Sequence, residues 1–207
     1  MARVTKTPEE RRDEIISTAQ KLFITKGYAQ TSVSDIVKTI GVAQGTFYYY
    51  FKSKEEVVNA IIDGYVNEII AQTMTIMENP ALMPLKKLEM MADAQRKVNM
   101  KENRNIHLIK GVDIHERIIA KLVLRHVPLM SRVLSELRPE KAVSRQEVLF
   151  MTEIFVAAAS LIFDPGIFQW SKSEKSERLT FIVSFMERSF GTHPGSFAFY
   201  RRLMGGS

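Results

Sequence analysis

Apolar residues recur every three or four positions through most of the 207-residue chain, separated by capping and stop signals. This spacing lines one face of a helix, and no stretch alternates as a strand does. The clearest helix starts are Thr7-Pro8-Glu9-Glu10, Ser53-Lys54-Glu55-Glu56 and Ser144-Arg145-Gln146-Glu147, each a capping residue followed three positions later by Glu. The pattern predicts an all-α chain of about nine helices.

Two short helices joined by a tight turn are predicted near the N-terminus, between Thr31 and Lys54. Ser32 and Asp35 have the spacing of a capping box at the start of the first short helix. Gly41 falls where this helix must end, a position that favours a residue with left-handed backbone.

The second short helix is expected from Ala43 to Phe51. Phe47 and Phe51 are one turn apart and are expected to face inward, which leaves small, polar and aromatic residues on the other faces. A compact helix–turn–helix with such a second helix suits the major groove of DNA.

The remaining signals divide the chain into segments. Residues 1–54 are predicted to form a three-helix domain that contains the helix–turn–helix, and a helix from about 54 to 79 is expected to connect it to a second helical domain, residues 80–191. Residues 192–207 are expected to form a tail, and whether its aromatic residues dock is left open.

Charge supports a polyanionic partner. The net charge is +6, and from the start to Lys54 nine basic residues face five acidic ones, an excess of four. A basic surface of this kind favours nucleic acid, although a merely solvated surface is the alternative.

Composition excludes other classes. The chain has no cysteine, which rules out thiolate metal sites and a catalytic thiol and fits a reducing cytoplasm. No apolar run approaches the roughly 20 residues of a membrane span. His115-Glu116 is followed by Ile119 where a HExxH zinc motif needs histidine. We therefore expect a cytoplasmic, nucleoid-associated protein without enzymatic activity, metal, cofactor or membrane partner.

Roughly the first third of the chain, Pro8 to Val66, resembles the TetR family of tetracycline-repressor-like transcriptional regulators. The matching segments, in the order and spacing of the family, are LFITKGY, TSVSDIVKTIGV, AQGTFYYYF and KSKEEV. Departures are Val37 and Ile40, where the family often has alanine, and Tyr50, where histidine is common.

The resemblance implies which side chains contact DNA. It implies base contacts for Ser34, Gln44, Gly45, Thr46 and Tyr48, and backbone contacts for Ser32, Val33, Tyr49, Tyr50, Lys52 and Lys54. Gln44 is suited to bidentate pairing with adenine, and Ala43 and Gly45 are small enough for close approach. The alternative is that the three tyrosines only pack within the protein.

The resemblance also implies a ligand-responsive repressor that binds a palindromic operator as a homodimer and is released by a small, partly apolar effector. The last two long helices would form the dimer interface, with an intramolecular core as the alternative, and the middle helices would enclose the effector, with ordinary core or surface roles as the alternative. Candidate interface residues are Phe155, Ala158, Leu161, Phe181, Phe185 and Met186. Candidate effector residues are Met90, His107, Met130, Phe150, Met151 and Trp170.

A rival interpretation is a helical protein-interaction adaptor that retains the helix–turn–helix without ligand control. The intact polar face from Ala43 to Tyr50 argues against it.

Overall fold

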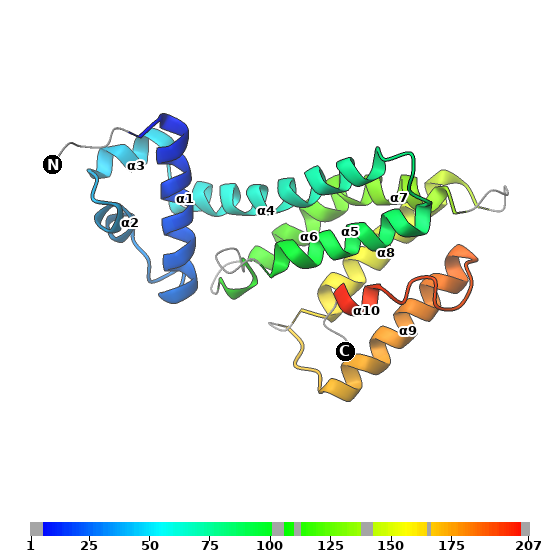
Figure 1. Ribbon diagram of the computed structural model, residues 1–207. Coiled ribbons are helices and arrows are strands. Elements are labelled where there is room, and N and C mark those ends of the chain that lie inside the picture. The colour runs from blue at the N-terminus through cyan, green and yellow to red at the C-terminus, as the bar shows by residue number, and fades with distance from the viewer. Residues whose placement is uncertain (1–5, 101–105, 110–112, 138–142, 165–166, 204–207) are drawn as a thin grey trace. The chain divides into compact units, whose positions relative to one another are not determined.

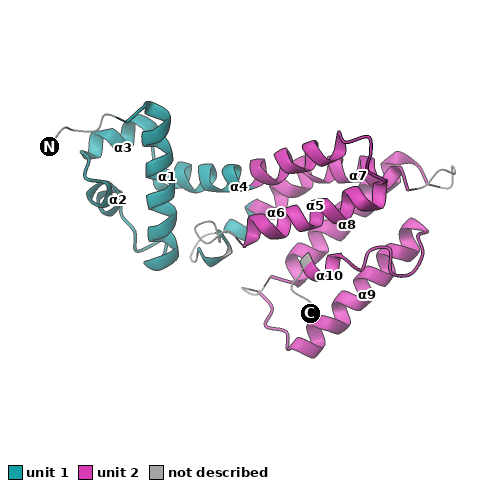
Figure 2. Cartoon of the chain, viewed as in Figure 1, with its two compact units in different colours: residues 1–65, 101–117 teal, residues 66–100, 118–207 magenta. Residues whose placement is uncertain are grey.

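The computed structural model of the chain describes residues 6–100, 106–109, 113–137, 143–164 and 167–203. Throughout these ranges the ordered elements are helices, which confirms the predicted all-α class (Figure 1). The chain divides into unit 1, residues 1–65 and 101–117, and unit 2, residues 66–100 and 118–207 (Figure 2).

Unit 1 contains the three helices predicted for the N-terminal domain. They are α1 (Pro8–Thr25), α2 (Val33–Ile40) and α3 (Gln44–Tyr50), and α2 packs against both α1 and α3 (Figure 1). The first part of α4 (Lys54–Met77), a short 3-10 turn η1 (Ile106–Leu108) and the start of α6 (Ile114–Arg125) complete it. The predicted boundary at residue 54 therefore missed a returning segment that belongs to unit 1.

The helix caps that the sequence predicted are present in the structure. The Thr7 and Ser32 hydroxyls each accept a hydrogen bond from the amide three residues later, and a carboxylate reaches back to the cap in both cases. Gly41 has φ +78°, a left-handed conformation that costs glycine little. Ser53 caps α4 by accepting from the Glu56 amide at 3.2 Å.

Unit 2 contains the rest of α4 and α6 together with five further helices. These are α5 (Pro84–Asn99), α7 (Val127–Ser135), α8 (Arg145–Ile162), α9 (Lys172–Phe190) and α10 (Tyr200–Leu203). Helix α7 packs against α5 and α8, and α10 packs against α5 and α9. Ser144 caps α8 as predicted, Ser171 caps α9 in the same way, and Gly191 ends α9 with φ +61°.

The segment after α9 is docked into unit 2, which resolves what the sequence left open. Phe197, Phe199 and Tyr200 are buried in one apolar cluster with residues of α5, α7, α8 and α9. The buried carboxylate of Glu187 accepts a hydrogen bond from the Phe197 amide at 3.1 Å. At the surface, Arg202 pairs with Glu89 at 2.8 Å. The described part of the predicted tail, up to residue 203, is therefore docked.

A buried polar pair lies between α4 and the junction of α6 and α7. The Thr73 hydroxyl and the Nε2 of His126 are 2.9 Å apart, and both residues are buried. Burial lowers the pKa of His126 to about 4, because desolvation disfavours the imidazolium form. His126 is therefore neutral at physiological pH.

Candidate nucleic-acid interface

Helix α3 separates an inward aromatic face from an outward polar one. Phe47 is fully buried and Phe51 nearly so, as their one-turn spacing predicted. On the opposite side Gln44 and Gly45 are exposed, and a Cβ added at Gly45 would meet no atom within 4 Å. Glycine is therefore not required there by contacts within the protein, which leaves room for a second molecule to approach the backbone.

The tyrosines of α3 are not simple packing residues. The Tyr49 side chain is 79% exposed and that of Tyr48 is 51% exposed, whereas Tyr50 is half-buried. Tyr49 and Tyr50 meet edge to face, with ring centroids 4.9 Å apart. These rings lie where their hydroxyls could contact the phosphate backbone of a DNA molecule at the protein surface.

The start of α2 is fixed by charge as well as by its cap. The Asp35 carboxylate accepts from the Ser32 amide and hydroxyl, each at 2.8 Å, and pairs with the Lys26 ammonium at 2.7 Å. The hydrogen bond from Lys26, followed by those from Ser32, holds the pKa of Asp35 well below its usual range. Val33 and Ser34 follow in the first turn and are half-buried.

Lys54 has partners that the sequence did not predict. Its ammonium donates to the backbone oxygens of Tyr28, at 2.9 Å, and Thr31, at 2.6 Å. It also lies 4.5 Å from the centroid of the Tyr28 ring, a cation–π distance. Lys52, in contrast, is exposed. Lys54 therefore ties the turn before α2 to the start of α4, while Lys52 is the better placed of the two lysines for a phosphate.

A chain of polar contacts continues from Lys54 to the start of α6. The Tyr28 hydroxyl donates to Glu55 at 3.2 Å, and the same carboxylate pairs with Arg117. Arg117 also donates to the Asn59 side-chain oxygen at 3.2 Å and pairs with Asp113 at 3.1 Å. Burial and the Glu55 charge raise the pKa of Tyr28, and the Arg117 hydrogen bond lowers that of Asp113. Sequence reasoning missed these contacts because Arg117 lies 62 positions from Glu55.

Comparison with known proteins finds transcriptional regulators of the HTH type. A family model described as "Bacterial regulatory proteins, tetR family" matches residues 15–61. The HTH-type transcriptional repressor KstR2 of Mycolicibacterium smegmatis is 33% identical over 81 residues, 39% of this chain and 39% of that protein. The HTH-type transcriptional regulator EthR of Mycobacterium tuberculosis is 38% identical over 73 residues, 35% of this chain and 34% of that protein. The chain thus spans about two fifths or less of these curated relatives.

Solved structures extend the likeness of fold to nearly the whole chain. A TetR/AcrR-family transcriptional regulator from Thermobifida fusca aligns over 95% of this chain and 98% of its own, with a TM-score of 0.59 and 23% identity. A TetR-family transcriptional regulator from Bordetella parapertussis aligns over 96% of both chains, with a TM-score of 0.56 and 20% identity.

The N-terminal helices of this chain are therefore similar to those of the TetR family, and its fold is similar to that of TetR/AcrR-family regulators.

The predicted effector residues that the structure describes differ in burial. Met130 is buried in the core of unit 2 and Met151 packs against that core, whereas Phe150 is 51% exposed. Met90 lies at the surface of α5, and the side chain of His107 lies outside what the structure describes.

The Trp170 side chain contacts residues on both sides of the loop between α8 and α9. Its indole nitrogen donates to the Ile162 oxygen at 2.8 Å, and its ring stacks on Phe168 at 5.1 Å. The Arg178 guanidinium lies 3.5 Å from the centroid of the indole ring. These contacts close the loop, so a role as an effector contact is not what the geometry favours.

The predicted dimer residues divide into two groups. Phe155 and Met186 are buried in the core of unit 2, which favours the intramolecular alternative for these two residues. Phe181, Phe185 and Leu161 are exposed, and Ala158 is half-buried. We call the set of exposed apolar residues on α8 and α9 the α8–α9 face: Phe150, Ile154, Leu161, Phe181 and Phe185.

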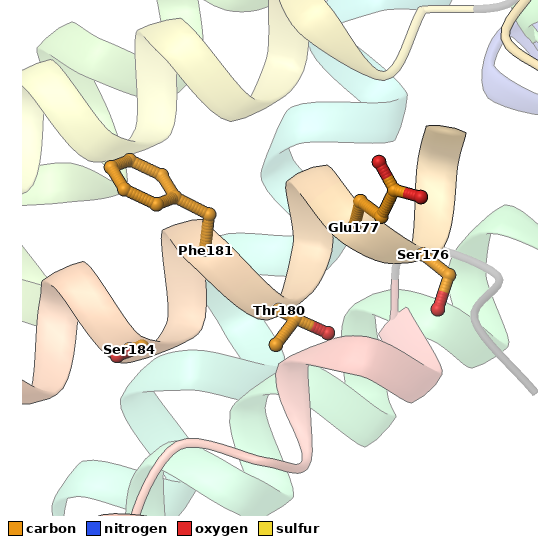
Figure 3. A pocket seen from close by; sticks show the side chains of 5 residues that line it. All are labelled: Ser176, Glu177, Thr180, Phe181 and Ser184. Carbon is orange, nitrogen blue, oxygen red and sulfur yellow. The ribbon is translucent and has the colours of Figure 1, made fainter. Parts of the chain in front are cut away.

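A shallow pocket of about 440 Å³ lies on α9, next to Phe181 (Figure 3). Its remaining lining residues are polar: Ser176, Glu177, Thr180 and Ser184. None of the six predicted effector residues lines it. Within the described ranges no group of three or more His, Asp or Glu side chains is arranged to hold a metal ion. No helix there is long and apolar enough to cross a membrane.

Proposed function

We propose that this chain is a DNA-binding transcriptional repressor. The observation that carries the proposal is the arrangement of α3, where buried Phe47 and Phe51 anchor a helix whose Gln44, Gly45 and Tyr49 face outward. Such a helix is small enough for the major groove and presents a side chain suited to reading adenine. The regulators KstR2 and EthR, which share the N-terminal region, support this assignment. We expect it to act on the nucleoid in the cytoplasm.

The proposed base contacts are made by Ser34, Gln44, Gly45, Thr46 and Tyr48, with Ala43 allowing close approach. Exposed Tyr49 and Lys52, half-buried Tyr50, and Ser32 and Val33 at the start of α2 would contact phosphates. Lys54 acts on DNA indirectly in this proposal, because its ammonium is hydrogen-bonded to two backbone oxygens.

We further propose a homodimer formed through the α8–α9 face. Phe181 and Ile154 are 63% and 64% exposed, and Phe181 stacks on Phe185 with ring centroids 6.0 Å apart. Exposed aromatic and aliphatic side chains support an interaction surface when they lie together. A two-fold dimer would present two α3 helices to half-sites about 34–36 Å apart, as palindromic operators require.

A small, partly apolar effector is proposed to release the operator by favouring a state in which α3 no longer fits the groove. Such control needs different effector affinities in the two states, and it is reciprocal, so bound DNA must weaken effector binding by the same factor. We place its site in unit 2, where methionines such as Met130 and Met151 line the core and can repack around a ligand.

Selection of bound duplexes from a random-sequence pool tests the proposal. We expect a palindromic duplex to be enriched. The affinity of the protein for this duplex should fall steeply as the salt concentration rises, because contacts between lysine side chains and DNA phosphates release counterions. Recovery of no enriched sequence, together with salt-independent binding, would refute the repressor and support the adaptor interpretation instead.

A further inference from the structure

We propose that Arg117 is a positioning residue for DNA binding, which acts through Glu55 and Tyr28 on the turn that precedes α2. The inference rests on the proposed DNA-binding function and assigns Arg117 a role without contact to DNA. All of the residues concerned lie in unit 1, whose second segment, residues 101–117, returns to the N-terminal helices (Figure 2).

The first step is that the returning segment is anchored. Ile106, Ile109 and Ile114 are at most 2% exposed, and η1 contacts α1. Burying such apolar side chains stabilises the segment that carries them. Arg117, one turn after Ile114, is therefore held at a fixed position in unit 1.

The second step is that Arg117 has several partners at once. It pairs with Glu55 and donates to Asn59 of α4, and it pairs with Asp113 on its own chain segment. Its side chain is 27% exposed. An isolated exposed ion pair contributes little to stability, but a guanidinium shared among three oxygen-bearing side chains is held in one orientation.

The third step leads from Glu55 to the helix–turn–helix. The other Glu55 oxygen accepts from the Tyr28 hydroxyl, and the Tyr28 ring and backbone oxygen both contact the Lys54 ammonium. Lys54 in turn holds the Thr31 oxygen, one residue before the Ser32 cap of α2. Arg117 thus lies at one end of a chain of contacts whose other end sets where α2 begins.

A displacement of this turn changes how α2 and α3 meet DNA. Specific contacts depend on side-chain geometry to within fractions of an ångström, whereas non-specific attraction depends chiefly on the number of cationic side chains that contact phosphates. Loss of the Arg117 contacts should therefore weaken specific binding more than non-specific binding. A phosphate-contacting arginine would instead weaken both alike.

The test compares Arg117→Met, which removes the guanidinium but keeps the apolar stem, with Arg117→Lys and the matched control Arg125→Met. Arg125 is also on α6 and bonds to the Asn67 side chain at 2.7 Å. The probes are a duplex selected by the wild-type protein from a random pool and a scrambled duplex of equal length and composition. Affinities are measured for the full-length variants over a range of salt concentrations.

We expect Arg117→Met to bind the selected duplex roughly three- to tenfold more weakly, while binding to the scrambled duplex and the salt slope stay unchanged. Arg117→Lys should recover part of the loss, and Arg125→Met should bind like the wild type. Wild-type affinity of Arg117→Met for the selected duplex would overturn the inference. Equal losses on both duplexes with a reduced salt slope would also overturn it, because they indicate a direct phosphate contact.

A second variant keeps the inference testable if Arg117→Met fails to fold. Tyr28→Phe removes only the hydroxyl that bonds Glu55 and should reproduce the selective loss. In the double variant the two losses should be less than additive, because both act through Glu55. Fully additive losses of affinity would refute the proposal that Arg117 and Tyr28 act through Glu55. A wild-type protein that selects no duplex would refute the proposed function itself, whereas selective wild-type binding with unaffected variants would refute only the role of Arg117.

Discussion

Acidification should destabilise unit 2 through one buried histidine. His126 is 3% exposed and shares a hydrogen bond with Thr73. Burial lowers its pKa to about 4 in the folded protein, from an ordinary value of 6.5. The unfolded chain therefore binds a proton at higher pH than the folded one, and stability falls as the pH drops through 6.5 and levels off below about 4.

The magnitude follows from these two pKa values. Between pH 7 and pH 5 the unfolded histidine becomes almost fully protonated while His126 in the folded protein stays largely neutral. Linkage then gives a loss of about 2 kcal/mol in the free energy of unfolding over this interval. Carboxylates with lowered pKa values, such as Asp35, lose their stabilisation chiefly at lower pH and are common to all variants.

Urea denaturation followed by circular dichroism at pH 7, 6 and 5 provides the assay. His126→Gln keeps a hydrogen-bonding side chain beside Thr73 but does not titrate, so its loss between pH 7 and pH 5 should be smaller than that of the wild type by about 2 kcal/mol. His193→Gln, which changes an exposed histidine, is the matched control and should behave like the wild type. Equal pH dependence in all three proteins would refute the reasoning.

Three further predictions concern recognition, assembly and the C-terminal segment. Gln44→Ala should lose roughly 1–3 kcal/mol of discrimination at one base pair of a selected duplex, measured by competition with single-base variants; equal losses on scrambled DNA would contradict a reading role. Phe181→Ser with Phe185→Ser should shift the protein from dimer to monomer in sedimentation at micromolar concentration; an unchanged dimer would place the interface elsewhere. Phe197→Ala should lower the free energy of unfolding by about 3–5 kcal/mol, and exposed Phe181→Ala by far less; similar effects would contradict docking of the C-terminal segment.

Local patterns predicted most helices because their determinants lie within a few residues of one another. The caps at Ser32 and Ser144 and the left-handed Gly41 act through contacts three or four positions away. The inward placement of Phe47 and Phe51 follows from helical periodicity alone. These features predicted the exposed polar surface of α3 without tertiary information.

Long-range contacts were not predicted from the sequence. Helix α9 carries apolar residues on more than one face, so periodicity did not separate buried Met186 from exposed Phe181. Trp170 resembled a ligand contact because its partners, Ile162 and Arg178, are eight positions away on either side of a loop. The family resemblance assigned Lys54 to the phosphate backbone, and its contacts with the Tyr28 and Thr31 carbonyls carry no sequence signature.

The loop between α8 and α9 gives the protein a built-in optical reporter. Trp170 is the single tryptophan of the chain, and its indole lies between the Phe168 ring and the Arg178 guanidinium. Emission excited selectively at the indole therefore originates in unit 2, whereas far-ultraviolet dichroism sums the helices of both units. A denaturation curve followed by both signals distinguishes concerted unfolding from stepwise unfolding. Coincident transitions mean that the two units unfold together. Separate transitions mean that the helices of unit 1 unfold independently of unit 2.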